Sequence, residues 1–342
     1  MPVLTGTWSV GVAVGAFLLA AVVIAFTGSR LALVVDRLAD RSGLGEAIAG
    51  AVLLGGATSL AGLVVSIVAA ASNEPSVAIS NSVGGIAVQT AFIVVLDVAY
   101  RGVNLEHAAA SITNLFSSLL MITLLATAVL GAAAPPTTLL GVHPATMILV
   151  LIYGYGLRIS RQINEEPMWR PRITQDTSVD EPEDPAEGEG VSALWGRFVM
   201  LAVVVALSGW VIGRAGLSLV AATGLSGTLV AVAFTSVATS LPELVTGLAA
   251  VRAGALTLAV GGIIGGNTFD TLFIAASDVV YQEGSLYAAM VPSDLFAIGW
   301  TMLLTGILGA GLVRRQQWRI GFEGVAILVL YVAGLVVLSV MG

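Results

Sequence analysis

The sequence predicts an all-α polytopic membrane protein of ten transmembrane helices, arranged as two inverted five-helix repeats with broken helices at the core. The prediction depends on composition, on the spacing of apolar segments and on an internal repeat. Of the 342 residues, 57% are hydrophobic and only 10% are charged. About a quarter of an ordinary soluble domain is charged, so this composition indicates a chain that lies in a lipid bilayer.

Apolar runs long enough to cross a bilayer follow one another along the chain. We expect ten spans, at residues 8–36, 44–71, 76–99, 106–131, 141–158, 194–214, 222–251, 255–281, 289–313 and 320–341. The polar segment 159–193, rich in proline, glutamate and aspartate, is predicted to be a mobile acidic linker. The domains are then a first repeat (1–158, with a hairpin at 44–99), the linker, and a second, inverted repeat (194–342, with a hairpin at 222–281).

The positions of the arginines predict the orientation in the membrane. If the linker is cytoplasmic, ten spans place both termini outside the cell membrane. Thirteen of the fourteen basic residues, all arginines, then lie toward the cytoplasm, and only Arg214 lies outside. Short cytoplasmic loops carry an excess of positive charge, so this distribution favours the orientation.

The internal repeat relates the two halves at an offset of 181 residues. GLGEAIAGAVLLGGATSLAGLV (43–64) aligns with GLSGTLVAVAFTSVATSLPELV (224–245), and FIVVLDVAYRGVNL (92–105) aligns with FIAASDVVYQEGSL (273–286). Matching pairs include Thr58/Thr239, Ser59/Ser240, Gly84/Gly265, Gly85/Gly266, Thr90/Thr271, Asp97/Asp278 and Tyr100/Tyr281. Because each half has an odd number of spans, the second half must be inverted, as in secondary transporters.

The stretch 235–270 places two acids inside apolar sequence. Pro242 removes a backbone donor and breaks the helix where Glu243 sits, and such a break is tolerated in a membrane only beside a cavity or under protein cover. Thr239, Ser240 and Glu243 share one face of the helix, and Asp270 lies on the next helix behind close-packing glycines. Ionisable residues at this depth usually have a function. Oxygen donors, in a chain without cysteine, indicate a site for a hard cation.

These residues resemble a known family. ATSLPELVTGLAA (238–250) and GGIIGGNTFD (261–270) resemble the second α-repeat of the cation/Ca²⁺ exchanger superfamily, which includes the sodium/calcium exchangers, and RIGFEGVAILVLYVAGL (319–335) resembles its last span. The resemblance implies an antiporter that binds its cation with oxygen ligands from both repeats. The residues it implies as cation ligands are Glu243, Asp270, Thr239, Ser240, Thr58, Ser59, Gln89 and Asn81.

The first repeat departs from the family pattern. The resemblance implies a Pro-Glu pair and an Asn or Asp in each repeat, yet this sequence has Ala61, Gly62 and Gln89 at the corresponding positions. The site would therefore be one-sided, with Glu243 and Asp270 giving a maximum charge of −2. That charge neutralises one divalent ion, or Glu243 carries a proton in a cation/H⁺ antiporter. The coupling ion stays open.

We therefore expect an antiporter that exchanges Ca²⁺ or a related cation for Na⁺ or H⁺ by alternating access. The alternative is a degenerate, non-transporting homologue with a cation-sensing or structural role. We expect no enzyme, because HExxH, a membrane aspartyl-protease motif and a serine with a histidine at membrane depth are all lacking. The expected partners are small inorganic cations and the lipid bilayer, with no cofactor and no nucleic acid. Asp97 and Asp278 sit at span ends and are expected to be structural, and Glu323, which follows Arg319, is expected to form an interfacial pair.

Overall fold

The computed structural model describes residues 7–42, 55–109, 111–169, 190–314 and 320–341, together with Arg172, Thr174 and Thr177. This part of the chain folds into helices and contains no strand. The helices of the first half are α2 (Val10–Ser42), α4 (Gly55–Thr58), α5 (Leu60–Ala71), α6 (Pro75–Ala99), α7 (Leu105–Ala108), α8 (Ile112–Ala133) and α9 (Pro144–Glu165). Those of the second half are α10 (Val191–Thr223), α11 (Gly227–Val230), the π-helix η2 (Ala231–Thr235), α12 (Ser236–Thr239), α13 (Leu241–Ala253), α14 (Leu256–Asp270), α15 (Leu272–Val280), α16 (Pro292–Arg314) and α17 (Phe322–Met341).

Among the described residues, seven helical runs are long and apolar enough to cross a bilayer, and eight if the bent run from α11 to α13 counts as one span. Helices lie in all ten segments that the sequence predicts as spans, although residues 44–54 of the second fall outside the described ranges. Helix α9 is not among the seven. It begins only at Pro144, and its later turns carry Arg158 and Arg161, which lower its apolarity.

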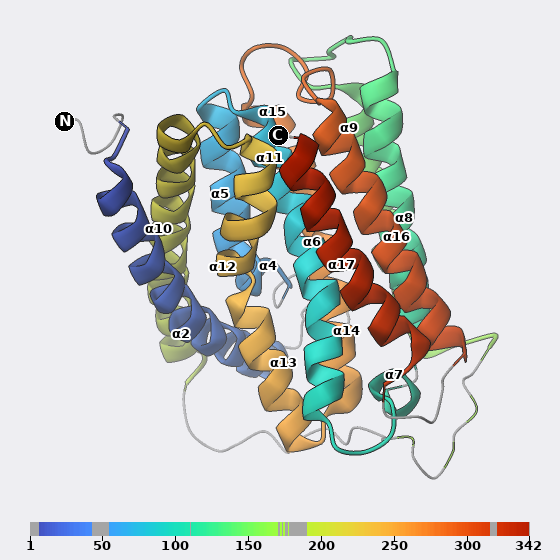
Figure 1. Ribbon diagram of the computed structural model, residues 1–342. Coiled ribbons are helices and arrows are strands. Elements are labelled where there is room, and N and C mark those ends of the chain that lie inside the picture. Colours follow the sequence, from blue (N-terminus) through green and yellow to red (C-terminus); the bar gives the residue numbers. More distant parts are fainter. Residues whose placement is uncertain are drawn as a thin grey trace.

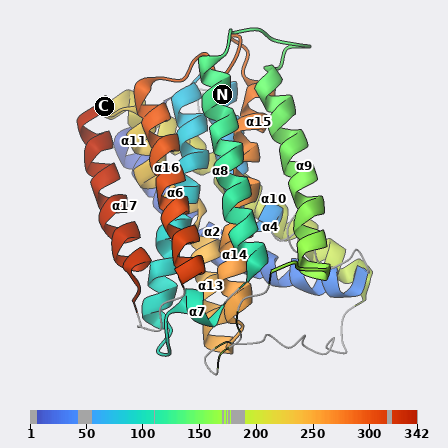
Figure 2. The same ribbon diagram turned by 90° about the vertical axis from the view of Figure 1, so that its right-hand side faces the viewer.

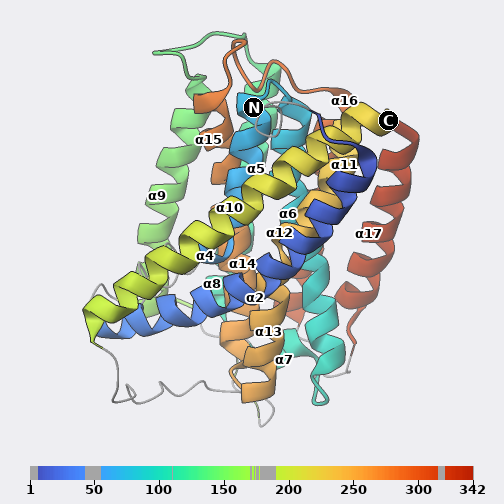
Figure 3. The same cartoon turned by 90° about the vertical axis from the view of Figure 1, so that its left-hand side faces the viewer.

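The two longest helices, α2 and α10, have 33 residues each and pack against each other in opposite directions. Figure 3 shows them slanting across one face of the molecule, whereas α8, α9, α16 and α17 stand on the opposite side (Figure 2). The first described residues and the end of α17 lie at one end of the molecule. The end of α9 and the start of α10 lie at the other end (Figure 1).

Helix α6 runs through the centre of the molecule and packs against helices of both halves (Figure 1). Every residue from Val77 to Val94 is buried. A helix that is surrounded on all sides has no face left for water or lipid, so its polar side chains need partners within the protein. Three of these polar side chains, Asn81, Ser82 and Gln89, lead to the site described below.

The helix breaks occur at matching serines in the two halves. Ser59 separates α4 from α5 with φ −83° and ψ 0°, and Ser240 separates α12 from α13 with φ −93° and ψ 4°. The second break bends the helix axis by 44°. Pro242 explains it, since its ring clashes with the preceding turn. Ser59 has nearly the same backbone angles with Ala61 at the matching position, so this local backbone conformation forms without proline.

Asp294 ties three helices together at one end of the bundle. It lies in the first turn of α16 and is fully buried. Its carboxylate accepts hydrogen bonds from the hydroxyls of Ser76, Ser80 and Thr228 over 2.7–3.0 Å and from the backbone amide of Val291 over 3.1 Å. The charge is satisfied by donors from α6, α11 and its own turn, which indicates a structural role.

Both ends of the segment 159–193, which the sequence predicts to be a linker, are helical. Helix α9 continues to Glu165, where an ion pair one turn apart joins Arg161 Nε to Glu165 Oε1 over 2.7 Å. Helix α10 already begins at Val191. The predicted mobility of the acidic run in between concerns residues that lie outside the described part of the chain.

Candidate cation site

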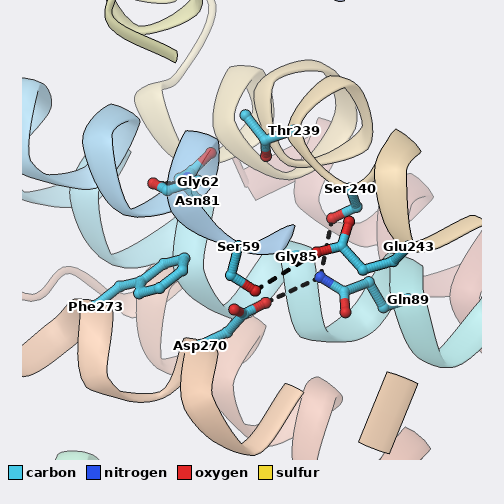
Figure 4. A pocket seen from close by; sticks show the side chains of 10 residues that line it. All are labelled: Ser59, Gly62, Asn81, Gly85, Gln89, Thr239, Ser240, Glu243, Asp270 and Phe273. Carbon is cyan, nitrogen blue, oxygen red and sulfur yellow. Dashed lines mark hydrogen bonds between the residues drawn. The ribbon is translucent and has the colours of Figure 1, made fainter. Parts of the chain in front are cut away.

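The two helix breaks face each other across a small cavity. Its volume is about 10 Å³, which is near the minimum that holds one water molecule or one ion of similar size. Residues of α5, α6, α12, α13, α14 and α15, together with the two break serines, form its walls (Figure 4). The lining residues are Ser59, Gly62, Asn81, Gly85, Gln89, Thr239, Ser240, Glu243, Asp270 and Phe273.

Glu243 reaches the cavity from the first turn of α13, directly after the second break. Its side chain is 4% exposed. Ser59 Oγ donates to Glu243 Oε1 over a long 3.5 Å, and Thr58 hydrogen-bonds the same carboxylate. Figure 4 shows Ser59 between the two carboxylates of the site. The first half therefore supplies hydroxyl groups that hydrogen-bond the acid of the second half.

Asp270 ends α14 and points into the same cavity with 2% exposure. Gln89 Nε2 donates to Asp270 Oδ2 over 2.9 Å and to Ser240 Oγ over 3.1 Å. The backbone carbonyl of Asp270 accepts from Ser82 Oγ over 2.6 Å. Donors on α6 thus fix the position of this acid.

Asn81 and Thr239 line the cavity but have partners elsewhere. Asn81 Nδ2 donates to the carbonyl of Gly62 and to Ser66 Oγ, and Asn81 Oδ1 accepts from Thr235 Oγ1 over 2.8 Å. Thr239 Oγ1 donates to backbone carbonyls of the preceding turn. Both side chains brace the broken helices in this conformation, and Thr239 keeps oxygen lone pairs available to the cavity.

Three oxygens on cavity-lining residues have no hydrogen-bond partner in the part of the chain that the structure describes. They are Gln89 Oε1, Glu243 Oε2 and Asp270 Oδ1, and all three are buried. A buried oxygen without a donor costs about 1–3 kcal/mol, and more when it is charged, so native proteins rarely leave one unmatched. Two of these oxygens belong to Glu243 and Asp270, the acids that meet at this ion-sized cavity, which indicates a site for a cation or for protons.

The charge of the site supports the same conclusion. The lining residues include two acids and no base. Two buried carboxylates without a counter-ion cost on the order of several kcal/mol each. The described part of the chain contains no group of three His, Asp or Glu residues arranged to hold a metal. Amide and hydroxyl oxygens would have to complete the ligand set beside these two acids.

Phe273 closes the side of the cavity opposite Glu243. A Cβ atom at Gly62 would lie 3.0 Å from Phe273 Cε2 and 3.6 Å from Thr239 Oγ1. A glutamate at position 62 would therefore need Phe273 to move. The sequence pattern does not single out Phe273, although it lies in the repeated block that starts with Phe92 and Phe273. Position 62, where the family resemblance implies an acid, thus lies against an aromatic side chain.

The long helices reach the breaks through two glycines. A Cβ at Gly28 of α2 would lie 2.5 Å from Pro242 Cγ, and a Cβ at Gly209 of α10 would lie 2.6 Å from the carbonyl oxygen of Ala61. The two glycines are 181 residues apart, as are Ala61 and Pro242. Each long helix therefore packs against the helix break of the other half of the chain.

Two further polar residues of the predicted core stay outside the cavity wall. Thr58 precedes Ser59 and hydrogen-bonds Glu243 without lining the cavity. Asn267 Nδ2 donates to Thr90 Oγ1 over 3.3 Å, while Asn267 Oδ1 has no partner. The structure thus brings seven of the eight predicted ligands to one cavity, Thr58 being the exception.

A family model described as "Sodium/calcium exchanger protein" matches residues 12–162 and 192–340. The chain belongs to this family. Its members are transporters of ions, which accords with the multi-pass membrane architecture and the buried acids described above. The match covers both halves and leaves out most of the acidic segment between them. Among curated protein sequences, none matches this chain.

Solved structures of exchangers share the fold. The sodium-calcium exchanger NCX_Mj, soaked with Na⁺ and Sr²⁺, aligns with a TM-score of 0.60 at 19% identity over 96% of this chain and 99% of its own. The H⁺/Ca²⁺ exchanger CAX aligns at 0.67 and 14% identity, over 96% and 85% of the chains. Native YfkE aligns at 0.65 and 15% identity, over 97% of each. At these identities the likeness concerns the fold.

Proposed function

We propose that this protein is a secondary active antiporter that exchanges Ca²⁺, or a related divalent cation, across the membrane at the Glu243/Asp270 cavity. The single observation that carries the proposal is the set of three buried, unpartnered oxygens on Gln89, Glu243 and Asp270. Family membership supports cation antiport as the activity. Carboxylate, amide and hydroxyl oxygens are the ligands that Ca²⁺ takes in proteins.

The size and charge of the cavity favour H⁺ over Na⁺ as the counter-ion. Two acids give a maximum charge of −2, which one divalent ion or two protons neutralise. Two Na⁺ ions would need two volumes with several oxygen ligands each, whereas the cavity has room for one ion. Phe273 and Gly62 remove the space for a further acid. We therefore propose exchange of one divalent cation for two protons, with Na⁺ as the alternative.

Transport by alternating access requires that the cavity open to each side in turn. We propose two inverted five-helix repeats, 1–158 and 194–342, joined by 159–193, with both termini outside and the linker in the cytoplasm. The opposite directions of α2 and α10 and their matched contacts with the two breaks support this arrangement. Sliding of these two helices past the breaks would expose the cavity first on one side and then on the other.

The test is uptake of radioactive Ca²⁺ into proteoliposomes under an imposed H⁺ or Na⁺ gradient. We expect uptake driven by the H⁺ gradient, abolished in Glu243→Gln and in Asp270→Asn. The matched control is Glu166→Gln, which changes an exposed acid just beyond α9. Undiminished uptake in both cavity variants would show that Glu243 and Asp270 do not form the transport site. Uptake driven only by a Na⁺ gradient would identify Na⁺ as the counter-ion.

The alternative function is a non-transporting homologue that binds a cation for sensing or structure. The apolar wall at Phe273 and the missing acid at position 62 favour it. Ca²⁺-dependent thermal stabilisation that Glu243→Gln abolishes, together with no uptake under either gradient, would establish this alternative. Absence of both binding and uptake would point to a different cation.

A further inference from the structure

Three buried carboxylates gather around α7, away from the cation cavity. Asp97 ends α6, Glu106 lies in α7, and Glu323 opens α17, with exposures of 2%, 2% and 1%. Asn104 Nδ2 donates to Glu323 Oε1 over 2.6 Å, and the backbone amide of Leu105 donates to Asp97 Oδ1 over 2.8 Å. Glu323, which the sequence places in an interfacial pair after Arg319, is buried and accepts from Asn104, whereas Arg319 lies outside the described residues.

Two oxygens of this cluster lack partners. Glu106 Oε2 and Glu323 Oε2 are buried without any hydrogen bond. The side chain of Glu323 is enclosed by glycines, since a Cβ at Gly311 would lie 2.5 Å from Glu323 Cγ. Each of these buried oxygens needs a donor, and the described residues supply none.

Three described basic groups near α7 have the following surroundings. His107 Nε2 pairs with Thr174 Oγ1 over 2.9 Å, Arg101 is exposed, and the guanidinium of Arg314 in α16 lies 5.3 Å from the centre of the Phe322 ring. Helices α14 and α16 also pack on α7. Their acids have partners elsewhere: Asp270 accepts from Gln89, and Asp294 accepts from Ser80. Asp97 and Glu323 are the charges that act on Glu106.

The matching place in the second half shows that the fold does not require an acid here. The backbone amide of Leu286 donates to Asp278 Oδ1 over 3.0 Å, as Leu105 does to Asp97. The residue that matches Glu106 is Tyr287, whose hydroxyl pairs with Thr146 Oγ1 over 2.9 Å. The second half therefore forms the matching turn with a neutral, hydrogen-bonded tyrosine. The carboxyl group at position 106 occurs in the first half alone.

We propose that Glu106 is a reversible proton-binding site, separate from the cation cavity, whose occupancy controls how firmly α7 docks against α6 and α17. With its proton, Glu106 is neutral and its O–H supplies a donor inside the cluster. When the proton leaves to bulk water, a further negative charge remains beside Asp97 and Glu323. Repulsion then weakens the contacts of α7 with the end of α6 and the start of α17.

The pH range follows from the electrostatics of the site. Burial, and then the neighbouring Asp97 carboxylate, raise the pKa of Glu106 from its ordinary value of about 4.5 to about 8. Between these two values the folded protein keeps a proton that the unfolded chain has lost. Raising the pH through this range therefore lowers the stability of the folded state, and the loss is complete above pH 8 or so.

The experiment follows the thermal stability of the full chain in detergent from about pH 5 to about pH 9. It uses the Glu243→Gln/Asp270→Asn background, in which the cavity acids no longer titrate. We expect the melting temperature to fall with rising pH in this background, and Glu106→Gln to flatten the profile, because glutamine mimics the neutral acid. Glu166→Gln, an exposed change, is expected to keep the original slope.

Parallel profiles with and without Glu106→Gln would overturn the proposal. If Glu106→Gln does not fold, Glu323→Gln removes one neighbouring charge and is expected to shift the fall in stability to lower pH. An infrared spectrum gives a direct readout, since a protonated carboxyl band should be present near neutral pH and absent after Glu106→Gln. An unchanged band in that variant would equally exclude Glu106 as the proton carrier. None of these readouts depends on transport.

Discussion

Gln89 and Asp270 occupy matching positions of the two halves and are hydrogen-bonded to each other, with Gln89 Nε2 donating to Asp270 Oδ2 over 2.9 Å. Asp270 of the second half is thus held by Gln89, the amide side chain at the matching position of the first half. This amide donor fixes Asp270, while Gln89 Oε1 points away from the two acids (Figure 4) and has no hydrogen-bond partner among the described residues. The pair makes the site asymmetric in charge although its backbone is built from matching elements.

The first prediction concerns Gln89→Glu. The substitution keeps the size of the side chain, removes the donor to Asp270 and adds a third carboxylate. Like charges favour protonation, so the site should bind protons more tightly, and the pH of half-maximal Ca²⁺ uptake should rise by about one unit or more. Uptake into proteoliposomes across a pH series measures the shift. Gln162→Glu, on the exposed face of α9, should leave the midpoint in place.

A second prediction tests the apolar wall. Gly62→Ala places a Cβ 3.0 Å from Phe273 and should destabilise the protein by about 1–3 kcal/mol. Phe273→Leu should relieve the clash, so the cost of Gly62→Ala should be smaller in that background. A double-mutant cycle on thermal unfolding measures the coupling. Additive effects would mean that Phe273 does not limit the space at position 62.

The third prediction concerns the glycines of the long helices. Gly28→Ala and Gly209→Ala push a methyl group against Pro242 and Ala61, and should slow Ca²⁺ uptake by about tenfold or more while Ca²⁺ affinity changes little. Uptake rates and equilibrium Ca²⁺ binding separate the two effects. Gly15→Ala is the matched control on α2, because nothing lies within 4 Å of its added Cβ. A rate loss equal to that of the control would contradict a role in movement.

A fourth prediction addresses Asp294. Asp294→Ala leaves the hydroxyls of Ser80 and Thr228 without their shared acceptor and should lower the free energy of unfolding by about 3–5 kcal/mol. Asp294→Asn keeps one acceptor oxygen and should cost less. Thermal unfolding in detergent measures both. Equal costs for the two variants would show that shape, and not hydrogen bonding, determines the stability at this position.

The sequence was sufficient to predict the main helices and the positions of most cavity residues. Apolar runs, prolines and glycines mark where helices begin and end, and the repeat places Ser59 opposite Ser240. Glu243 and Asp270 are conspicuous because acids are rare in apolar sequence. Such local signals need no knowledge of packing.

Other features depend on contacts between distant segments and leave no local pattern. Phe273 becomes a cavity wall only because Gly62 lies against it, and Asn81 turns out to brace a helix break rather than present a free amide. The burial of Glu323 follows from its contact with Asn104, 219 residues away in the chain. The break at Ser59 occurs without a proline and lies against Gly209, a contact that the local sequence does not reveal.

The crossed contacts of α2 and α10 have a consequence for how such a protein could arise. Since α2 packs on Pro242 and α10 packs on Ala61, the helix break of each half is packed against the long helix of the other half. A gene encoding a single half would yield a working carrier only if two copies inserted into the membrane in opposite orientations and paired as antiparallel dimers. Fusion of the two copies into one chain would make these contacts intramolecular and would let the two halves diverge in sequence, as Gly62 and Glu243 do.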